Sequence, residues 1–414
     1  MGVMKSSVLP KSLCSLVLLA SFANADDALV HQWPQFRGLG GQGHSGARDL
    51  PSTWSETDNI AWKVDVPGAG NSSPVITGKQ VWLTSSLDNG KRLSVLCYDR
   101  ERGDLVHDIE VFSGTPRHRR NDPQRPHANP TPVIEGDRLY VHFGQHGTAC
   151  LTTAGEVVWS TQLLHDPMYC PSSSPVLYKD LLIVPCCGRR HSYIAALDKQ
   201  TGDVRWQRQN KGRQADSTPL LIRAGEADQL VCNLASRIVS LDPQTGKDIW
   251  SIRQRGCANV PRPLFGHGLI FVCGGYMKPD IYAIKPDGRG DVSKTHIRWQ
   301  SDRSVPQNAS PVIVGDELYL ITDKGGIASC LDARTGEVHW RKRIGGAYYA
   351  SMLVADGRIY LSSEEGRTTV IAPKTTFQEL ATNQIDGEIR ASLAAVGKAI
   401  YLRSDSKLYR IEAK

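Results

Sequence analysis

The residues that most suggest redox chemistry are the adjacent pair Cys186-Cys187, which lies in the sequence Pro-Cys-Cys-Gly. Neighbouring cysteines can close a small strained ring, a vicinal disulfide, and strained disulfides are readily reduced. Of the ten cysteines, nine remain if the N-terminal segment with Cys14 is removed. An odd number leaves at least one thiol unpaired, and a cysteine also serves as a small buried side chain. The pair is therefore a candidate vicinal disulfide, with two free thiols as the alternative.

Two other motifs suggest ligand chemistry but have unsuitable surroundings. Residues 38–43 match the glycine fingerprint of dinucleotide-binding folds, yet Pro34 precedes them and Pro51 follows, so the required strand and helix cannot flank them. We interpret this stretch as a flexible loop. His142 and His146 have a spacing that aligns metal ligands on a helix, whereas their neighbours predict a strand. We expect no metal site there.

Two basic stretches could attract an anion. One contains Arg119 and Arg120, and the other contains Arg189 and Arg190. If both lie at one end of the molecule, they would attract a phosphate, a sugar acid or an acidic peptide. The alternative is that both are solvated charged loops.

A short repeat must position all of these residues. The motif Asp-x-x-Thr-Gly-x-x-x-Trp occurs in three clear copies and three weaker ones. Its Asp begins a tight turn, its Gly supplies a positive φ, and its Trp follows on the next strand, where the ring can pack against the neighbouring repeat. We therefore predict structural roles between repeats for Trp62, Trp159, Trp206, Trp250, Trp299 and Trp340.

A second signature, a small hydroxyl residue followed by Pro and an apolar run, marks the start of most repeats. Arg262 replaces the hydroxyl residue in the fifth repeat, and the last two repeats are weaker copies in which Met352 and Leu393 replace Pro. These anchors are Ser73, Thr131, Ser174, Thr218, Arg262, Ser310, Ser351 and Ser392. They are spaced 58, 43, 44, 44, 48, 41 and 41 residues apart, and such a period is typical of repeat architectures. Each repeat contains four short strand-like runs separated by turn residues. The sequence thus predicts an all-β fold, an eight-bladed β-propeller of four-stranded antiparallel blades.

The two ends of the chain are expected to meet in the last blade. The eighth repeat lacks an outer strand after Ile411, and residues 60–64 can supply one. We therefore divide the chain into a signal peptide (residues 1–25), an N-terminal extension (26–59) and the propeller (60–414). A β-solenoid or two unrelated β domains would leave the exchanged strand without a role.

The first residues have the features of an export signal. Lys5 and Lys11 precede an apolar run that is too short to span a bilayer, and a small-residue cleavage site ends at Ala25, before Asp26. Cleavage would lower the formal net charge from +7 to +5, a mild excess that argues against nucleic-acid binding. We expect a periplasmic or secreted monomer without a membrane span.

A propeller would place polar side chains around its axis. The positions two residues before each anchor share a face of the strand with the anchors, so both sets can face the channel. The candidate ligand-binding residues of this funnel are Asn71, Asn129, Asp216, Arg262, Asn308 and Arg390. The two basic stretches would lie at its mouth. The alternative is a wet polar channel that binds nothing specific.

The repeat, with Ser-Pro at its start and Thr-Gly-x-x-x-Trp at its end, resembles the pyrroloquinoline-quinone-like repeat of BamB-like propellers and quinoprotein alcohol dehydrogenases. The stretch Trp33-Pro34-Gln35-Phe36-Arg37-Gly38 resembles secreted bacterial propellers of this class. The resemblance covers residues 33–412 and is specific for fold rather than function.

The two branches of the resemblance imply different functions. BamB-like members imply a non-catalytic scaffold, without a cofactor, that binds a protein or an anionic polymer in the cell envelope, and we favour this interpretation. Quinoprotein members imply instead a dehydrogenase that uses pyrroloquinoline quinone (PQQ) and Ca²⁺, with Cys186-Cys187 against the cofactor. The Glu/Asn/Asp set that binds Ca²⁺ in those enzymes cannot be assembled from this sequence.

Overall fold

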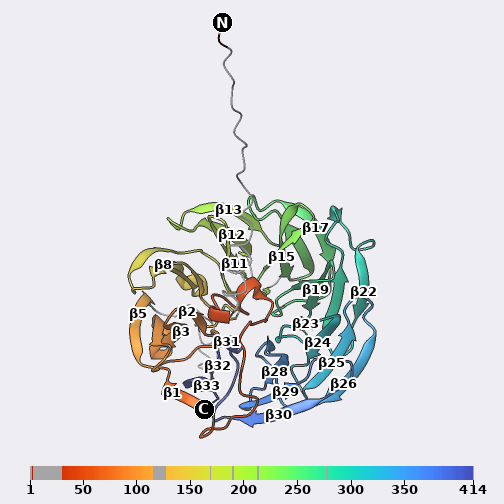
Figure 1. Cartoon of the computed structure of the whole chain (residues 1–414). Helices are drawn as coiled ribbons and strands as arrows, with labels where there is room; N and C mark the ends of the chain where they lie inside the picture. Colours follow the sequence, from red (N-terminus) through yellow and green to blue (C-terminus); the bar gives the residue numbers. More distant parts are fainter. Residues whose placement is uncertain are drawn as a thin grey trace.

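Eight β-sheets form a ring around a central axis, as Figure 1 shows in a view along that axis. The computed structural model describes Gly2 and residues 30–114, 127–167, 169–188, 191–211, 214–276 and 278–413. Apart from the helical residues Val30 and His31, the helical segments of these residues are the 3-10 turns η1 (Leu39–Gly41), η2 (Asp88–Gly90) and η3 (Gly144–His146). The predicted all-β, eight-bladed propeller is confirmed.

In each blade, antiparallel strands lie side by side in order from the axis to the rim of the propeller. Blade 1 contains β2 (Val75–Thr77), β3 (Gln80–Leu87), β4 (Arg92–Asp99) and β5 (Leu105–Ser113). Blade 2 contains β6 (Val133–Glu135), β7 (Arg138–His142), β8 (Thr148–Thr152) and β9 (Val157–Thr161). Blade 3 contains β10 (Val176–Tyr178), β11 (Leu181–Cys186), β12 (Tyr193–Asp198) and β13 (Val204–Gln209). Blade 4 contains β14 (Leu220–Ala224), β15 (Ala227–Leu234), β16 (Arg237–Leu241) and β17 (Asp248–Arg253).

The remaining blades follow the same order. Blade 5 contains β18 (Leu264–Gly266), β19 (Leu269–Gly274), β20 (Asp280–Ile284) and β22 (Ile297–Ser301). Blade 6 contains β23 (Val312–Val314), β24 (Glu317–Ile321), β25 (Ile327–Asp332) and β26 (Val338–Arg343). Blade 7 contains β27 (Leu353–Ala355), β28 (Arg358–Ser362), β29 (Arg367–Ile371) and β30 (Glu379–Gln384). Blade 8 contains β31 (Ala394–Val396), β32 (Ala399–Arg403), β33 (Lys407–Glu412) and the early strand β1 (Ile60–Asp65).

The ring is closed by strand β1, as predicted. It pairs antiparallel with β33, so that Ile60 lies opposite Ile411. The indole N–H of Trp62 on β1 donates to the Arg100 carbonyl at 3.1 Å, and Arg100 belongs to the first blade. The exchanged strand therefore completes blade 8 and ties it to blade 1.

The motif tryptophans join adjacent blades through one repeated contact. Each half-buried indole donates its N–H to a backbone carbonyl of the next blade: Trp159 to Lys199 (3.1 Å), Trp206 to Pro243 (3.2 Å), Trp299 to Ala333 (2.9 Å) and Trp340 to Lys374 (3.0 Å). The turn glycine lies against the same ring. A Cβ on Gly202, whose φ is 81°, would come within 2.7 Å of Trp159. The motif therefore needs glycine both for the turn and for the close approach of the ring.

Trp250 departs from this pattern. It is 1% exposed, and its N–H donates to Gln229 Oε1 of its own blade at 2.9 Å. The insertion in blade 5 forms a short strand, β21 (Gly290–Asp291), which pairs parallel with β17 and lies opposite Trp250. β21 is therefore a fifth strand of blade 4, and it covers the indole ring of Trp250.

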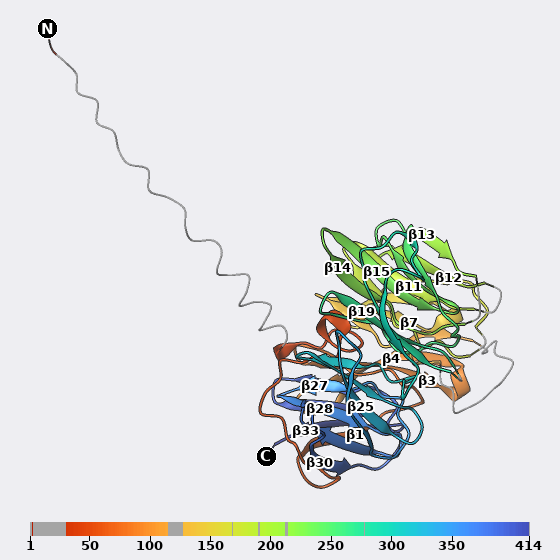
Figure 2. The same ribbon diagram turned by 90° about the vertical axis from the view of Figure 1, so that its right-hand side faces the viewer.

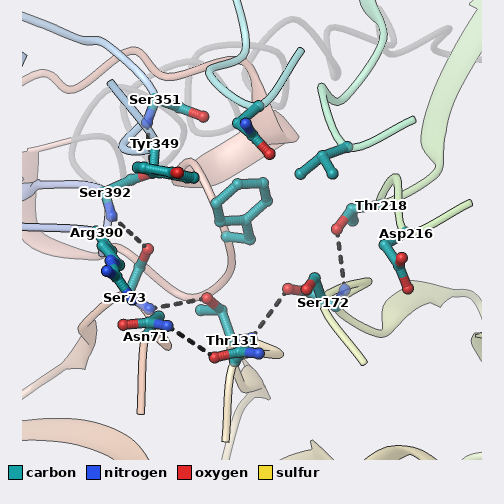
Figure 3. A pocket seen from close by; sticks show the side chains of 15 residues that line it. Asn71, Ser73, Thr131, Ser172, Asp216, Thr218, Tyr349, Ser351, Arg390 and Ser392 are labelled. Carbon is teal, nitrogen blue, oxygen red and sulfur yellow. Dashed lines mark hydrogen bonds between the residues drawn. The ribbon is translucent and has the colours of Figure 1, made fainter. Parts of the chain in front are cut away.

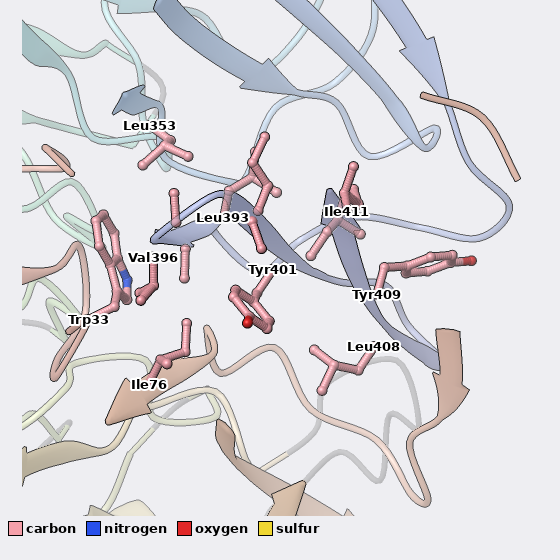
Figure 4. Close-up of a cluster of buried hydrophobic side chains, with 14 of the residues drawn as sticks. Trp33, Ile76, Leu353, Leu393, Val396, Tyr401, Leu408, Tyr409 and Ile411 are labelled. Atoms are coloured by element: carbon pink, nitrogen blue, oxygen red, sulfur yellow. The ribbon is translucent and has the colours of Figure 1, made fainter. Parts of the chain in front are cut away.

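The N-terminal extension is part of the hydrophobic core. Trp33 is buried and shares two backbone hydrogen bonds of 2.9 Å with Ile76 of blade 1. Figure 4 shows Trp33 beside Ile76 and Val396, in the cluster that also holds the buried side chains of blade 8. The extension thus packs across the junction between the first and last blades.

Candidate functional site

Seven hydrogen bonds link the inner strands around the axis. In each, the backbone N–H of one anchor donates to the hydroxyl oxygen of the next anchor around the ring. The pairs are Ser73–Thr131, Thr131–Ser174, Ser174–Thr218, Arg262–Ser310, Ser310–Ser351, Ser351–Ser392 and Ser392–Ser73, at 2.9–3.1 Å. An eighth link would require a hydroxyl at position 262, where the chain has Arg. The small hydroxyl residues of the repeat therefore fasten the blades to one another at the axis.

A polar cavity of about 160 Å³ lies on the axis and is partly open to solvent. Figure 3 shows side chains from blades all around the ring pointing toward it. Its walls consist of all eight positions two residues before the anchors and of six anchors: Asn71, Asn129, Ser172, Asp216, Val260, Asn308, Tyr349 and Arg390, with Ser73, Thr131, Ser174, Thr218, Ser351 and Ser392. Phe36 of the N-terminal extension completes the lining.

The N-terminal extension supplies the floor of this cavity by crossing one end of the ring. Its backbone and side chains bond to several inner strands. The contacts are Ile134 N–H to Pro34 O (2.8 Å), Arg37 Nη2 to Pro311 O (2.6 Å), Phe265 N–H to Gln42 Oε1 (2.8 Å) and Val354 N–H to Gly43 O (2.8 Å). Figure 2 shows this red segment along one side of the ring. We call residues 33–45 the plug.

The glycine-rich stretch at residues 38–43 is therefore not the flexible loop that we expected. It forms η1 and is packed inside the plug. Gly38 has a φ of 73°, and a Cβ there would lie 2.5 Å from the ring of Trp33. Gly38 thus permits close packing within the plug, and Gly41 permits the close approach of the Arg262 guanidinium from the fifth repeat. The sequence pattern did not show this because the plug is held by residues hundreds of positions away.

Arg262 does not line the cavity, which corrects the expectation that it faces the funnel. Its Nε donates to Pro219 O at 3.1 Å, and its Nη1 donates to Phe36 O at 2.8 Å. The guanidinium is buried, and this burial lowers its pKa to about 10. The Arg262 side chain is longer than the hydroxyl side chains of the other anchors. It therefore extends beyond the cavity wall and bonds to the plug.

Two charged residues face the cavity from opposite blades. Asp216 precedes the inner strand of blade 4, and Arg390 precedes that of blade 8, so they lie on opposite sides in Figure 3. Asp216 is 8% exposed, and Gln214 Nε2 donates to its two oxygens at 3.0 and 2.9 Å. Burial raises the pKa of Asp216 to about 7, so its charge changes near neutral pH.

Arg390 is engaged by carboxylates. Its Nη2 lies 2.6 Å from Glu364 and 3.1 Å from Glu388, and its guanidinium lies 5.6 Å from the ring centre of Tyr349. The repeat placed Tyr349 in the row that faces the axis, but sequence reasoning missed Glu364, since nothing in the repeat distinguishes it. The positive charge on this side of the cavity is therefore offset by its neighbours.

The amides of the wall are held in place by hydrogen bonds. Asn71 Nδ2 donates to Asn129 Oδ1 at 3.0 Å, and Asn129 Nδ2 donates to Pro171 O at 3.3 Å. The backbone N–H of Asn308 donates to Asp323 Oδ1 at 2.7 Å. The structure thus brings together Asn71, Asn129, Asn308, Asp216 and Arg390. Arg119, Arg120, Arg189 and Arg190 lie outside the described residues.

Cys186 and Cys187 are both free, buried thiols in the structure, and neither lines the cavity. Cys186 packs in the core between blades 2 and 3. Burial, with a smaller contribution from Asp216, raises the pKa of Cys187 to about 12, which makes it a poor nucleophile at neutral pH. We therefore expect two free thiols, with the vicinal disulfide as the alternative.

The cavity does not fit PQQ held by Ca²⁺. This ion prefers about six to eight oxygen ligands that include several carboxylates. The lining offers one carboxyl group, Asp216, and the ring of Phe36 occupies the floor. No group of three or more metal-binding side chains was found in the described part of the chain.

The two histidines of the sequence analysis are structural. His142 lies buried on β7 with its Nδ1 2.9 Å from Thr148 Oγ1, and burial lowers its pKa to about 3. His146 lies in η3, with its ring 5.0 Å from that of His127. Within the described residues, none of the helices has the length and apolar character that a membrane span requires.

Comparisons with known proteins agree with this geometry. A family model described as outer membrane protein assembly factor BamB matches residues 45–169, 113–285 and 278–414. A search of curated proteins found no match. The crystal structure of BamB from Moraxella catarrhalis superposes with a TM-score of 0.63 at 12% identity, covering 85% of this chain and 99% of that one.

Quinoproteins share the fold as well. A quinohemoprotein alcohol dehydrogenase from Comamonas testosteroni gives a TM-score of 0.68 at 11% identity over 96% of this chain and 83% of its own. A europium-containing methanol dehydrogenase gives 0.65 at 10% identity over 93% and 92%. At these identities the structural matches show the fold alone. The family model, however, spans nearly the whole propeller, and the chain therefore belongs to the BamB-like family of PQQ-like repeat β-propellers.

Proposed function

We propose that this protein is a non-catalytic scaffold, periplasmic or secreted, that binds a protein or polymer partner across the face on which the axial cavity opens. We call this the funnel face. It carries the connections that enter the inner strands and those that join the second and third strands of each blade, since both meet the same end of an antiparallel blade.

The observation that carries this proposal is that four large apolar or aromatic side chains in loops of the funnel face are exposed. Leu164 is 74% exposed, Tyr276 is 63% exposed, and Tyr169 and Tyr349 are both 42% exposed. Three of them lie in loops that enter inner strands, and Tyr276 lies in the loop between β19 and β20. Tyrosine is enriched in protein interfaces, where it combines a large apolar area with a polar tip.

Other exposed apolar side chains lie elsewhere and provide controls. Val157 on β9 and Val204 on β13 are about half exposed, but both lie on outer strands, away from the axis. Family membership also supports an envelope partner, because the matching model is described as an outer-membrane assembly factor. That description belongs to the family and identifies no partner for this chain.

A capture experiment tests the proposal. The purified mature protein would serve as bait in solubilised envelope fractions from the cells that make it, next to the variant Leu164→Ser/Tyr276→Ser and the control Val157→Ser/Val204→Ser. We expect the wild type and the control to retain a common partner that the funnel-face variant loses. A partner lost by the control and retained by the funnel-face variant would refute the proposal.

A further inference from the structure

We infer that the axial cavity binds one neutral sugar residue, so that the polymer partner of the funnel face is a carbohydrate chain whose end enters the cavity. This inference rests on the proposed function, because the cavity opens on that face. It is carried by the juxtaposition of aromatic rings, amides and hydroxyl groups around a space of limited size.

The size of the cavity limits the ligand to a single small ring. Sites for drug-sized ligands occupy roughly 300–1,000 Å³, whereas this cavity has about 160 Å³. A peptide segment or a large planar cofactor would exceed it. One sugar ring fits, with the rest of its chain extending toward solvent.

The wall matches the hydrogen-bonding character of a sugar. Each of the six anchor hydroxyls that line the cavity accepts a backbone N–H and keeps its own hydrogen to donate. Asn71, Asn129 and Asn308 add amides, which have both donors and acceptors. Sugar hydroxyls likewise donate and accept. A wall that mixes both kinds of group therefore suits a polyol better than an anion, which needs donors alone.

Aromatic rings provide the second half of such a site. Phe36 lies at the floor and the partly exposed Tyr349 lies in the wall. Sugar rings present C–H groups on their faces, and these groups pack against the electron-rich face of an aromatic ring. A hydrophobic floor within a polar wall is otherwise difficult to explain, because a channel that only held water would gain nothing from Phe36.

The charges in the cavity favour a neutral ligand over a sugar acid. Arg390 is paired with Glu364 and Glu388, so it offers no uncompensated positive charge. Asp216 on the opposite side is bonded through both oxygens to Gln214. An anionic ligand would be repelled by the carboxylates beside Arg390 and by Asp216. A neutral sugar hydroxyl can instead donate to a carboxylate or accept from the guanidinium.

The test is a titration of the purified mature protein with the methyl glycosides of glucose, galactose, mannose and N-acetylglucosamine, measured by calorimetry and saturation-transfer NMR. We expect at least one glycoside to bind. Tyr349→Ala and Asn308→Ala should each weaken that binding by about tenfold or more. Val157→Ser should leave it unchanged, because Val157 lies on the outer strand β9, away from the axis and outside the cavity lining. Circular dichroism verifies that each variant is folded.

Three results would overturn the inference: no glycoside binds at about 50 mM, a concentration that would nearly saturate a site with a Kd of about 1 mM; glucuronate binds more tightly than every neutral glycoside; or an acidic peptide occupies the cavity instead. The two proposals fail separately. Partner capture without glycoside binding would leave the scaffold standing and remove the sugar site. Glycoside binding combined with unchanged partner capture by Leu164→Ser/Tyr276→Ser would leave the sugar site standing and remove the proposed binding of a partner by the funnel face.

Discussion

Replacing Asp216 by Asn should remove the decrease in the free energy of unfolding that we expect for the wild type as the pH rises. Burial raises the pKa of this carboxyl from an ordinary value of 3.8 to about 7. Between these two values the folded chain keeps a proton that the unfolded chain releases, so the free energy of unfolding falls as the pH rises. The stability is fully present below about pH 4 and is lost by about pH 7. A difference of about 3 pKa units corresponds to about 4 kcal/mol.

The assay is urea denaturation of the mature protein between pH 4 and pH 8. We expect the wild type and Asp216→Asn to have similar free energies of unfolding at pH 4, where the carboxyl is protonated in both states. With rising pH the variant should become the more stable protein, by up to about 4 kcal/mol. Parallel curves for the wild type and Asp216→Asn would refute the assignment of a buried, raised-pKa carboxyl.

Three further predictions follow from the ring. Ser174→Ala leaves the buried Thr131 N–H without its acceptor and should cost about 1–3 kcal/mol by urea denaturation; an unchanged midpoint would contradict a stabilising role for the hydroxyl ring. Trp250→Ala should cost about 3–5 kcal/mol and Trp206→Ala less, because the Trp206 ring is partly exposed, so equal losses would contradict the covering role of β21. Mass spectrometry without reduction should find free thiols at Cys186 and Cys187, and a peptide lighter by two hydrogens would establish the vicinal disulfide instead.

The fold could be predicted because its information is local and repeated. The Asp-x-x-Thr-Gly turn and the Trp after it lie within a few residues of each other, and each copy makes the same contact with the next blade. The missing strand of blade 8 was visible for the same reason, since one copy of the pattern ended early. The alternation of a strand also located the wall positions, such as Asn71 and Asn308.

The closed end of the cavity could not be predicted, because its contacts are distant in sequence. Arg37 bonds to Pro311, and Phe36 O accepts from Arg262. No period relates these residues, so the plug had the appearance of a loop before the propeller. The same limit hid the ion pair of Arg390 with Glu364 and the strand β21 over Trp250. Insertions and extensions have no counterpart in the repeat. The residues that they contact can therefore be identified only from the folded ring.

The most direct test of the funnel face is site-specific photo-crosslinking in the cells that make the protein. The photoreactive residue p-benzoylphenylalanine would replace Tyr276 on the funnel face in one strain and Val157 on an outer strand in another. We predict that irradiation joins a partner to position 276 and none to position 157. Adducts from position 157 alone would show that the partner binds the rim of the ring and would contradict the account.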